Sequence, residues 1–150
     1  MELKELITAI AEKHKEQGII INPPAANNDI LVLEKKVGFA LPLDFKAFYS
    51  YCNGFACDED AFNMTPLSEI YSPKHDYGNG WFYFAEYMTC SDKWGLRNTW
   101  DNRSELFCAT STEIVIGTSL NEFLKRFLAG NVFDDGGLCD WMIELGIYNK

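Results

Sequence analysis

The stretch that most constrains the fold of this chain is residues 30–54, ILVLEKKVGFALPLDFKAFYSYCNG, which predicts two helices separated by a defined stop. Apolar residues recur at helical spacing on both sides of Gly38, a residue type that readily takes the left-handed conformation at a helix end. Pro42 then fixes φ where the next helix begins, and Asn53-Gly54 ends that helix with two residue types that tolerate positive φ. The apolar stripes are Ile30, Leu33 and Val37 in the first helix and Phe45, Phe48, Tyr49 and Cys52 in the second.

The composition indicates one folded domain over residues 1–150. With 150 residues, 47% of them hydrophobic and 15% aromatic, the chain has enough apolar area to offset the entropy of ordering it. Residues 1–16 mix charges along an amphipathic helix, without the basic start and cleavage site of a secretion signal. No window approaches the roughly 20 apolar residues of a membrane span. We therefore expect a cytoplasmic protein that does not bind a membrane.

Further helices are predicted at both ends of the chain. The N-terminal helix carries an apolar stripe, and Gly18 is expected to end it. Residues 19–29, IIINPPAANND, are expected to form a loop, whose last Asn or Asp residues cap the helix that begins near Ile30. Ser119 and Glu122 have the spacing of a capping box and predict another helix, which Gly130 would end. The tail, LCDWMIELGIYNK, predicts one more short helix.

Short runs rich in aromatic and β-branched residues predict the strands of a sheet in the second half of the chain. The connections are too short for crossover helices, so the sheet is expected to be mostly antiparallel or mixed. The predicted fold class is α+β, a single domain with about four to five helices around the sheet. The predicted strands are residues 61–64, 80–88, 93–98, 105–110 and 113–117.

Negative charge is concentrated in the second part of the chain. The net charge is −9; residues 1–57 hold 7 acids and 6 bases, whereas residues 58–150 hold 15 acids and 7 bases. Such a surface repels a phosphate backbone and attracts a basic protein, so we expect a protein partner and no nucleic acid. The alternative is that the acidic residues only keep the domain in solution.

Patterns that would support catalysis or cofactor binding are weak. His75 and Asp76 are adjacent in a loop, which provides no defined triad geometry. Cys52 lies at a helix C-terminus, near acidic residues that raise a thiol pKa. The five cysteines contain no C-x-x-C pair, and neither a glycine-rich phosphate loop nor an EF-hand pattern occurs. We therefore expect no enzyme activity, cofactor, metal site or disulfide framework.

The motif over residues 30–54 resembles the SUKH superfamily of Smi/Knr-type proteins. The resemblance is strongest over these 25 residues and looser over most of the remaining chain. It implies an α+β fold without catalytic activity. Bacterial members are immunity proteins that neutralise a cognate toxin, often a nuclease, and fungal relatives regulate cell-wall synthesis. The residues that carry it are Glu34, Gly38, Leu41, Pro42, Asp44, Phe45, Phe48, Asn53 and Gly54.

We therefore predict an immunity protein that binds a toxin domain with a basic surface. The alternative is a regulatory or scaffold domain that binds a cellular protein. Glu34 and Asp44 are expected to be structural, and the binding surface is expected in the acidic half, where one or two of the surplus aromatic residues serve as anchors. The predicted partner-binding residues are Asp58, Glu59, Asp60, Asp134 and Asp135 as rim charges, with Trp94 or Trp100 as anchors.

Overall fold

The helices form where apolar residues recur at helical spacing, and the strands where aromatic and β-branched residues cluster. The structure, a computed structural model, describes residues 2–58, 62–87, 92–99, 101, 103–109 and 113–147. Within them lie six α-helices and one 3₁₀ helix. These are α1 (Leu3–Lys13), η1 (Lys15–Gln17, the 3₁₀ helix), α2 (Asn27–Val37), α3 (Leu43–Tyr51), α4 (Leu67–Ile70), α5 (Leu120–Gly130) and α6 (Leu138–Glu144).

One antiparallel sheet contains the eight strands found in the described part of the chain. Its order is β1-β2-β3-β5-β6-β7-β8, and β4 pairs with β5 beside this path. The aromatic strand β5 lies between β3 and β6 and is therefore a central strand. The strands are β1 (Ile19–Ile21), β2 (Phe55–Cys57), β3 (Phe62–Met64), β4 (Tyr77–Gly78), β5 (Trp81–Tyr87), β6 (Asp92–Asn98), β7 (Ser104–Ala109) and β8 (Glu113–Gly117).

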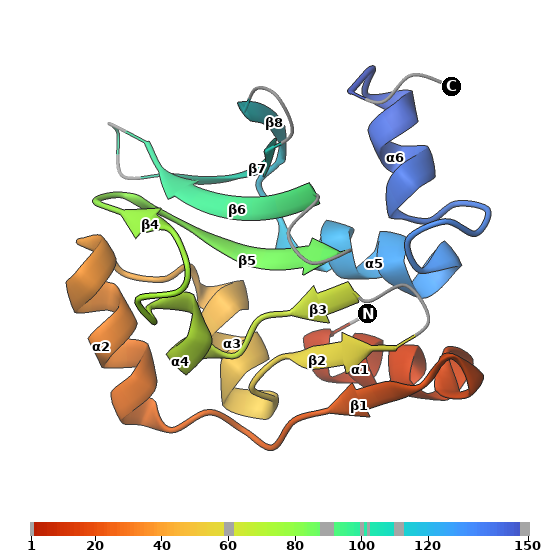
Figure 1. The fold of residues 1–150 in the computed structure, drawn as a ribbon, viewed down its shortest axis with the longest axis horizontal. Coiled ribbons are helices and arrows are strands. Elements are labelled where there is room, and N and C mark those ends of the chain that lie inside the picture. The colour runs from red at the N-terminus through yellow and green to blue at the C-terminus, as the bar shows by residue number, and fades with distance from the viewer. Residues whose placement is uncertain are drawn as a thin grey trace.

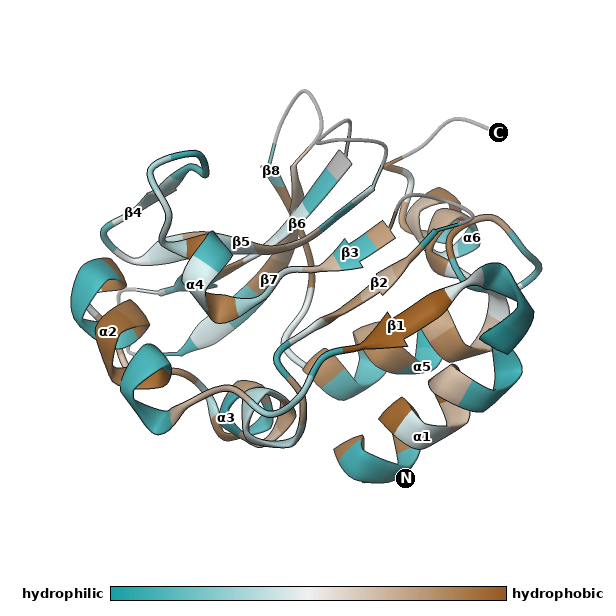
Figure 2. Ribbon diagram, turned by 60° about the horizontal axis from the view of Figure 1, so that its bottom comes forward, coloured by the Kyte–Doolittle hydropathy of each residue, from teal (hydrophilic) through white to brown (hydrophobic). Residues whose placement is uncertain are grey.

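Helices α1, α3 and α5 lie on one side of the sheet, and α6 follows α5 at one end of it (Figure 1). Ring contacts join these layers: the Phe45 ring of α3 lies 5.2 Å from Phe84 of β5, centroid to centroid. The Phe127 ring of α5 lies 4.6 Å from Phe62 of β3. Figure 2 shows hydrophobic and hydrophilic residues alternating around α1 and α5. The core is therefore an aromatic layer between the helices and one face of the sheet.

The α+β class predicted from the sequence is confirmed, together with most of its elements. Strands β3, β5, β6, β7 and β8 lie where aromatic runs predicted them. At the start of α5, the Ser119 hydroxyl accepts a hydrogen bond from the backbone N–H of Glu122 at 3.3 Å, as the capping-box spacing predicted. The predicted tail helix is α6. No described helix has both the length and the apolar content needed to cross a membrane.

Other segments differ from the sequence-based expectation. Ile19–Ile21, expected in a loop, forms the edge strand β1 because β2 pairs with it. Helix α2 begins at Asn27, after Ala26, and not near Ile30. Helix α1 ends at Lys13, and a 3₁₀ turn continues the chain to Gly18. Strand β2 and helix α4 were not predicted, because three or four residues are too few to show a periodic pattern.

The side chain of Glu34 closes the turn between α2 and α3. Gly38 ends α2 in the left-handed conformation, with φ 81°. Oε2 of Glu34 accepts a hydrogen bond from the backbone N–H of Leu41 at 2.7 Å, and the ammonium of Lys46 in α3 lies 3.6 Å from the same oxygen. Glu34 therefore contacts the chain on both sides of the turn, which fits the structural role expected for it.

The carboxylate of Asp44 joins the starts of two helices. Its Oδ1 accepts a hydrogen bond from the backbone N–H of Phe45 at 2.8 Å, in the first turn of α3. Its Oδ2 accepts one from the backbone N–H of Leu120 at 2.9 Å, at the first residue of α5. The first N–H groups of a helix have no partner within the helix, and the positive end of the dipole favours an anion. Asp44 is therefore structural, as expected.

The Asn53-Gly54 pair ends α3 where three segments meet. Oδ1 of Asn53 accepts a hydrogen bond from the backbone N–H of Leu67 at 2.9 Å, which caps α4. The backbone N–H of Asn53 donates to the carbonyl of Pro23 at 2.8 Å. Gly54 has φ 81°, and a Cβ there would collide with the carbonyl oxygen of Met64. Both residues of the motif are therefore explained by the fold.

We expect Asp44→Ala to lower the free energy of unfolding by about 2–3 kcal/mol, since two N–H groups at helix starts lose a charged acceptor. Asp44→Asn should cost less because the amide oxygen can replace one of the two acceptors. Urea denaturation measures both. The control is Asp135→Ala, an exposed aspartate for which a change within about 0.5 kcal/mol is expected. A loss for Asp44→Ala no larger than for the control would contradict the assigned role.

Candidate partner-binding surface

Three of the acidic residues predicted as rim charges, Asp58, Asp134 and Asp135, lie at one end of the molecule. Asp58 directly follows β2, and Asp134 and Asp135 lie in the connection between α5 and α6. Nδ2 of Asn131 lies 3.3 Å from Sγ of Cys57, so the two segments are in contact. Figure 1 shows the α5–α6 connection at the same end of the molecule as the end of β2. We call this region, with the exposed Glu16 and Phe133, the acidic end.

The charge of the acidic end is negative despite two nearby lysines. Glu16 and the three aspartates carry four negative charges, whereas Lys13 and Lys15 carry two positive ones. The ammonium of Lys13 donates a hydrogen bond at 2.7 Å to the carbonyl of Ala129, near the C-terminus of α5. The charge of Lys13 is therefore directed at the C-terminus of α5 and not at the aspartates. Glu59 and Asp60, the other predicted rim charges, lie outside the described residues.

Asn131 fixes the start of the α5–α6 connection. It is buried and has φ 50° and ψ −135°, a backbone conformation that residues other than glycine rarely adopt. Its Nδ2 donates to Oε1 of Gln17 at 2.5 Å, and its Oδ1 accepts from the backbone N–H of Val132 at 2.8 Å. The side chain thereby stabilises the unusual backbone and joins the connection to η1 and β2.

Backbone hydrogen bonds close the rest of the connection into a compact turn. The N–H of Asp134 donates to the carbonyl of Gly130 at 2.8 Å, and the N–H of Gly137 donates to that of Asp134 at 3.0 Å. A carboxylate oxygen of Asp140 accepts from the N–H of Gly136 at 2.8 Å. Side chains at Gly130 and Gly137 would collide with neighbouring backbone. The connection is therefore held by its own contacts.

Phe133 projects from this turn with 54% of its surface exposed. Its ring meets the ring of the half-buried Tyr87 edge-on, at 5.5 Å between centroids, and Tyr87 lies 6.1 Å from Trp94. Phe133 was not among the site residues predicted from the sequence. The available signal was its position directly before Asp134 and Asp135, in a turn where no helical or strand pattern would bury it.

Of the two aromatic residues predicted as anchors, Trp94 does not fit that role. It is 1% exposed, and its ring packs against Phe62 and Phe123 in the core. The strand register places it on the face that the helices cover, because it pairs with Ala85 and Cys108. The prediction of Trp94 as an exposed anchor is therefore corrected. Trp100 lies outside the described residues.

The opposite face of the sheet carries a second group of aromatic residues. Directly paired residues on antiparallel strands share a face, which puts Trp81 and Tyr83 of β5 on one side with Arg97 and Phe107. The ammonium of Lys93 lies 4.9 Å from the Tyr83 ring, and the guanidinium of Arg97 lies 5.5 Å from the Phe107 ring. These five residues form what we call the open sheet face, and Trp81 and Tyr83 are half-buried there.

Ion pairs and burial hold the side chains of the open sheet face. Arg97 lies 2.6 Å from a carboxylate oxygen of Glu105 and 3.2 Å from one of Glu113. Burial, reinforced by the negative charges of Glu113 and Asp76, raises the pKa of Tyr83. Tyr83 therefore keeps its proton at neutral pH and can act as a hydrogen-bond donor.

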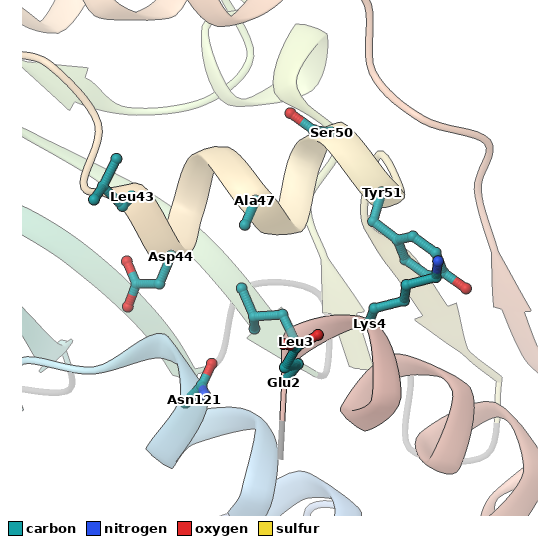
Figure 3. Close-up of a pocket in the computed structure, with 9 residues that line it drawn as sticks. All are labelled: Glu2, Leu3, Lys4, Leu43, Asp44, Ala47, Ser50, Tyr51 and Asn121. Atoms are coloured by element: carbon teal, nitrogen blue, oxygen red, sulfur yellow. The ribbon is translucent and has the colours of Figure 1, made fainter.

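A groove of about 570 Å³ lies between α3, the start of α1 and the start of α5. Figure 3 shows Leu43, Ala47 and Tyr51 along α3, with Ala47 directed toward Leu3 of α1. Leu43 is 83% exposed. Like Phe133, the groove exposes apolar side chains, but it lacks the concentration of like charge found at the acidic end. His75 does not line it, and the residue patterns for catalysis are not assembled there.

The thiol of Cys52 is buried in the core, where it is a poor nucleophile. Burial raises the pKa of Cys52 to about 11, so the thiol stays protonated at pH 7. The sequence predicted a raised pKa from the helix C-terminus and nearby acids, whereas burial is the main cause. Within the part of the chain that the structure describes, no three His, Cys, Asp or Glu residues gather to hold a metal ion.

Comparison with known proteins identifies a family for the central part of the chain. The model of the SMI1 / KNR4 family (SUKH-1) matches residues 24–126. This range contains the motif of residues 30–54 and the strands from β2 to β8, whereas Phe133, Asp134 and Asp135 lie beyond it. No curated protein matches the sequence.

We expect Asn131→Ala to lower the free energy of unfolding by about 2 kcal/mol, because buried hydrogen bonds are lost. Asn131→Gly should cost about 1 kcal/mol less than Asn131→Ala, since glycine adopts this backbone conformation without strain. Urea denaturation measures stability, and hydrogen exchange at the amides of Leu138 and Cys139 reports on the connection. Unchanged stability and exchange in Asn131→Ala would show that the connection does not depend on this side chain.

Alkylation should separate the cysteines by exposure. At pH 7.5 we expect iodoacetamide to modify the half-buried Cys139 before Cys52, because Cys52 is buried and protonated. Peptide mapping by mass spectrometry follows each site over time. Modification of Cys52 should accelerate only in urea concentrations that unfold the chain. Rapid modification of Cys52 in the folded protein would instead indicate an accessible, ionised thiol.

Proposed function

The chain belongs to the SMI1 / KNR4 family (SUKH-1), and on this premise we propose that it is a cytoplasmic immunity protein that binds and neutralises a cognate toxin. Members of this family are generally binding domains without enzymatic activity, so a protein-binding role agrees with the family. The proposed contact surface is the acidic end, with Asp58, Asp134 and Asp135 as rim charges. Glu59 and Asp60, which adjoin Asp58 in the sequence, belong to the same proposal.

The observation that carries this proposal is the convergence of two separate acidic segments at one end of the fold. Asp58 and Asp134 are 76 positions apart in the chain, yet the contact between Cys57 and Asn131 joins their segments. Like charges repel one another, so gathering them gives no gain in stability by itself. A basic partner would neutralise these charges, so the repulsion would disappear and the attraction would favour binding.

The chemistry of the proposed toxin explains why such a surface would be effective. An enzyme that cleaves nucleic acid presents basic residues around its active site to bind phosphates. An acidic surface can occupy that site in place of the substrate and is drawn to it over a Debye length of about 8 Å at physiological salt. Fast association matters because the toxin acts inside the same cell.

A regulatory or scaffold domain that binds a cellular protein is the second candidate, and the open sheet face favours it. Trp, Tyr and Arg are the residue types most enriched among interface hot spots, and this face presents Trp81, Tyr83 and Arg97 together. The neighbouring genes discriminate between the two candidates. A gene for a large secreted protein with a C-terminal toxin domain supports immunity, and neighbouring wall-synthesis genes support regulation.

We expect the association rate with the toxin domain encoded beside this gene to fall as ionic strength rises. The double variant Asp134→Asn/Asp135→Asn should reduce this rate on the order of 5- to 10-fold at low salt and weaken its salt dependence. Stopped-flow or surface-plasmon measurements at several salt concentrations provide the rates.

The matched control is Glu5→Gln/Glu69→Gln, which removes two exposed negative charges elsewhere on the molecule. Its association rate should stay within about twofold of the unmodified protein. Equal effects of the two double variants would mean that only the net charge matters. Binding whose association rate does not respond to salt would leave an immunity role possible but contradict the electrostatic mechanism.

A further inference from the structure

We propose that Phe133 is the anchor of the acidic end and inserts into an apolar pocket of the partner that is rimmed by Lys and Arg side chains. This inference rests on the proposed function, because it names the contact through which the acidic end would bind. The partner chemistry it specifies is narrower than a basic surface: an apolar cavity within that surface.

Phe133 is exposed although the residues on either side of its turn belong to the core. Over half of its surface faces solvent, although α5 ends only three positions earlier and the core lies directly beneath. Val132, the residue directly before Phe133, points into the core and is 1% exposed. The turn therefore buries one apolar residue and presents the other. An exposed aromatic ring gains from burial in a partner, because its apolar surface leaves water.

The backbone that carries Phe133 is held in place by several contacts. The backbone turn, the buried Asn131 side chain and the close contacts of Gly130 and Gly137 all hold the connection that carries Phe133. The ring also rests edge-on against Tyr87 at 5.5 Å. A side chain already held near its bound position loses less conformational entropy on binding, so more of the contact energy appears as affinity.

The negative charges around Phe133 define the chemistry of the partner. Asp134 and Asp135 follow Phe133 directly, and Asp58 and Glu16 belong to the same end of the molecule. A pocket that receives the ring must bring its own rim close to these carboxylates. A rim with Lys or Arg is attracted, whereas an acidic rim is repelled. An apolar centre with a charged rim is also the usual composition of a binding hot spot.

Leu31 is another exposed apolar side chain, and its surroundings differ from those of Phe133. Leu31 is 64% exposed, more than Phe133. It lies on α2, one turn before Lys35, and is not part of the acidic end. Single exposed apolar residues are common on protein surfaces and need no partner. Phe133 differs because three features coincide there: the ring is exposed, the backbone that carries it is held in place, and the negative charges around it attract a basic partner.

The test compares Phe133→Ser with Leu31→Ser against the toxin domain encoded beside this gene. Phe133→Ser should raise the dissociation rate at least about 30-fold and leave the association rate within about twofold, because the anchor acts after the charges have steered the encounter. Leu31→Ser should leave both rates unchanged, and Phe133→Trp should retain most of the affinity. Thermal unfolding of each variant verifies that the fold is intact.

Two outcomes separate this inference from the proposed function. If the toxin domain binds Phe133→Ser as tightly as the unmodified protein, the anchor is refuted and the immunity role stands. If the toxin domain does not bind the unmodified protein, the proposed toxin partner is wrong, and a second probe then decides the inference.

That second probe is a phage library of random twelve-residue peptides selected on the unmodified protein. We expect the enriched peptides to combine Lys or Arg with apolar residues. Their binding should fall at least about 10-fold on Phe133→Ser and stay unchanged on Leu31→Ser. Enriched peptides that bind Phe133→Ser equally well, or a selection that enriches no peptide, would overturn the inference.

Discussion

The fold depends on one carboxylate that connects two helix starts. Asp44 accepts hydrogen bonds from the first turn of α3 and from Leu120, the first residue of α5, which lies 76 positions after Asp44 in the sequence. Both helices pack aromatic residues onto the same face of the sheet, so this link fixes their relative position as well as their ends. The direction of α5 then determines where its C-terminal connection, and with it the acidic end, leaves the core.

The sequence predicted the elements that have a periodic pattern and missed those that depend on a neighbour. The stripe of Phe45, Phe48 and Tyr49 is buried as expected, and the Ser119 hydroxyl caps the start of α5. Strand β1 was missed, although its three residues are β-branched, because Pro23-Pro24 indicated a loop and only the pairing with β2 shows the strand. The same holds for Asp44: its place in the first turn of α3 was evident, but its bond to Leu120 needs the tertiary structure.

The chemistry of the candidate site stays a prediction, and the structure brings together only part of the residues predicted for it. Acidity of the second half indicated a basic protein partner, and the structure brings Asp58 to the same end as Asp134. Aromatic residues were harder to assign, because composition does not tell which face of a strand a ring occupies. Trp94 has the residue type of an anchor but points into the core, whereas Phe133 is an anchor candidate because its turn holds it outside.

The motif that identifies the family and the surface proposed to bind the partner are physically separate, and this separation has a consequence for specificity. Glu34, Asp44 and Asn53 use their polar atoms on backbone groups of the fold, so changes there cost stability. The side chains of Phe133 and Asp135 are exposed, and surface changes of this kind usually alter stability by less than about 0.5 kcal/mol. A chain built in this way can change its partner by substitutions at the acidic end without weakening the scaffold that presents it.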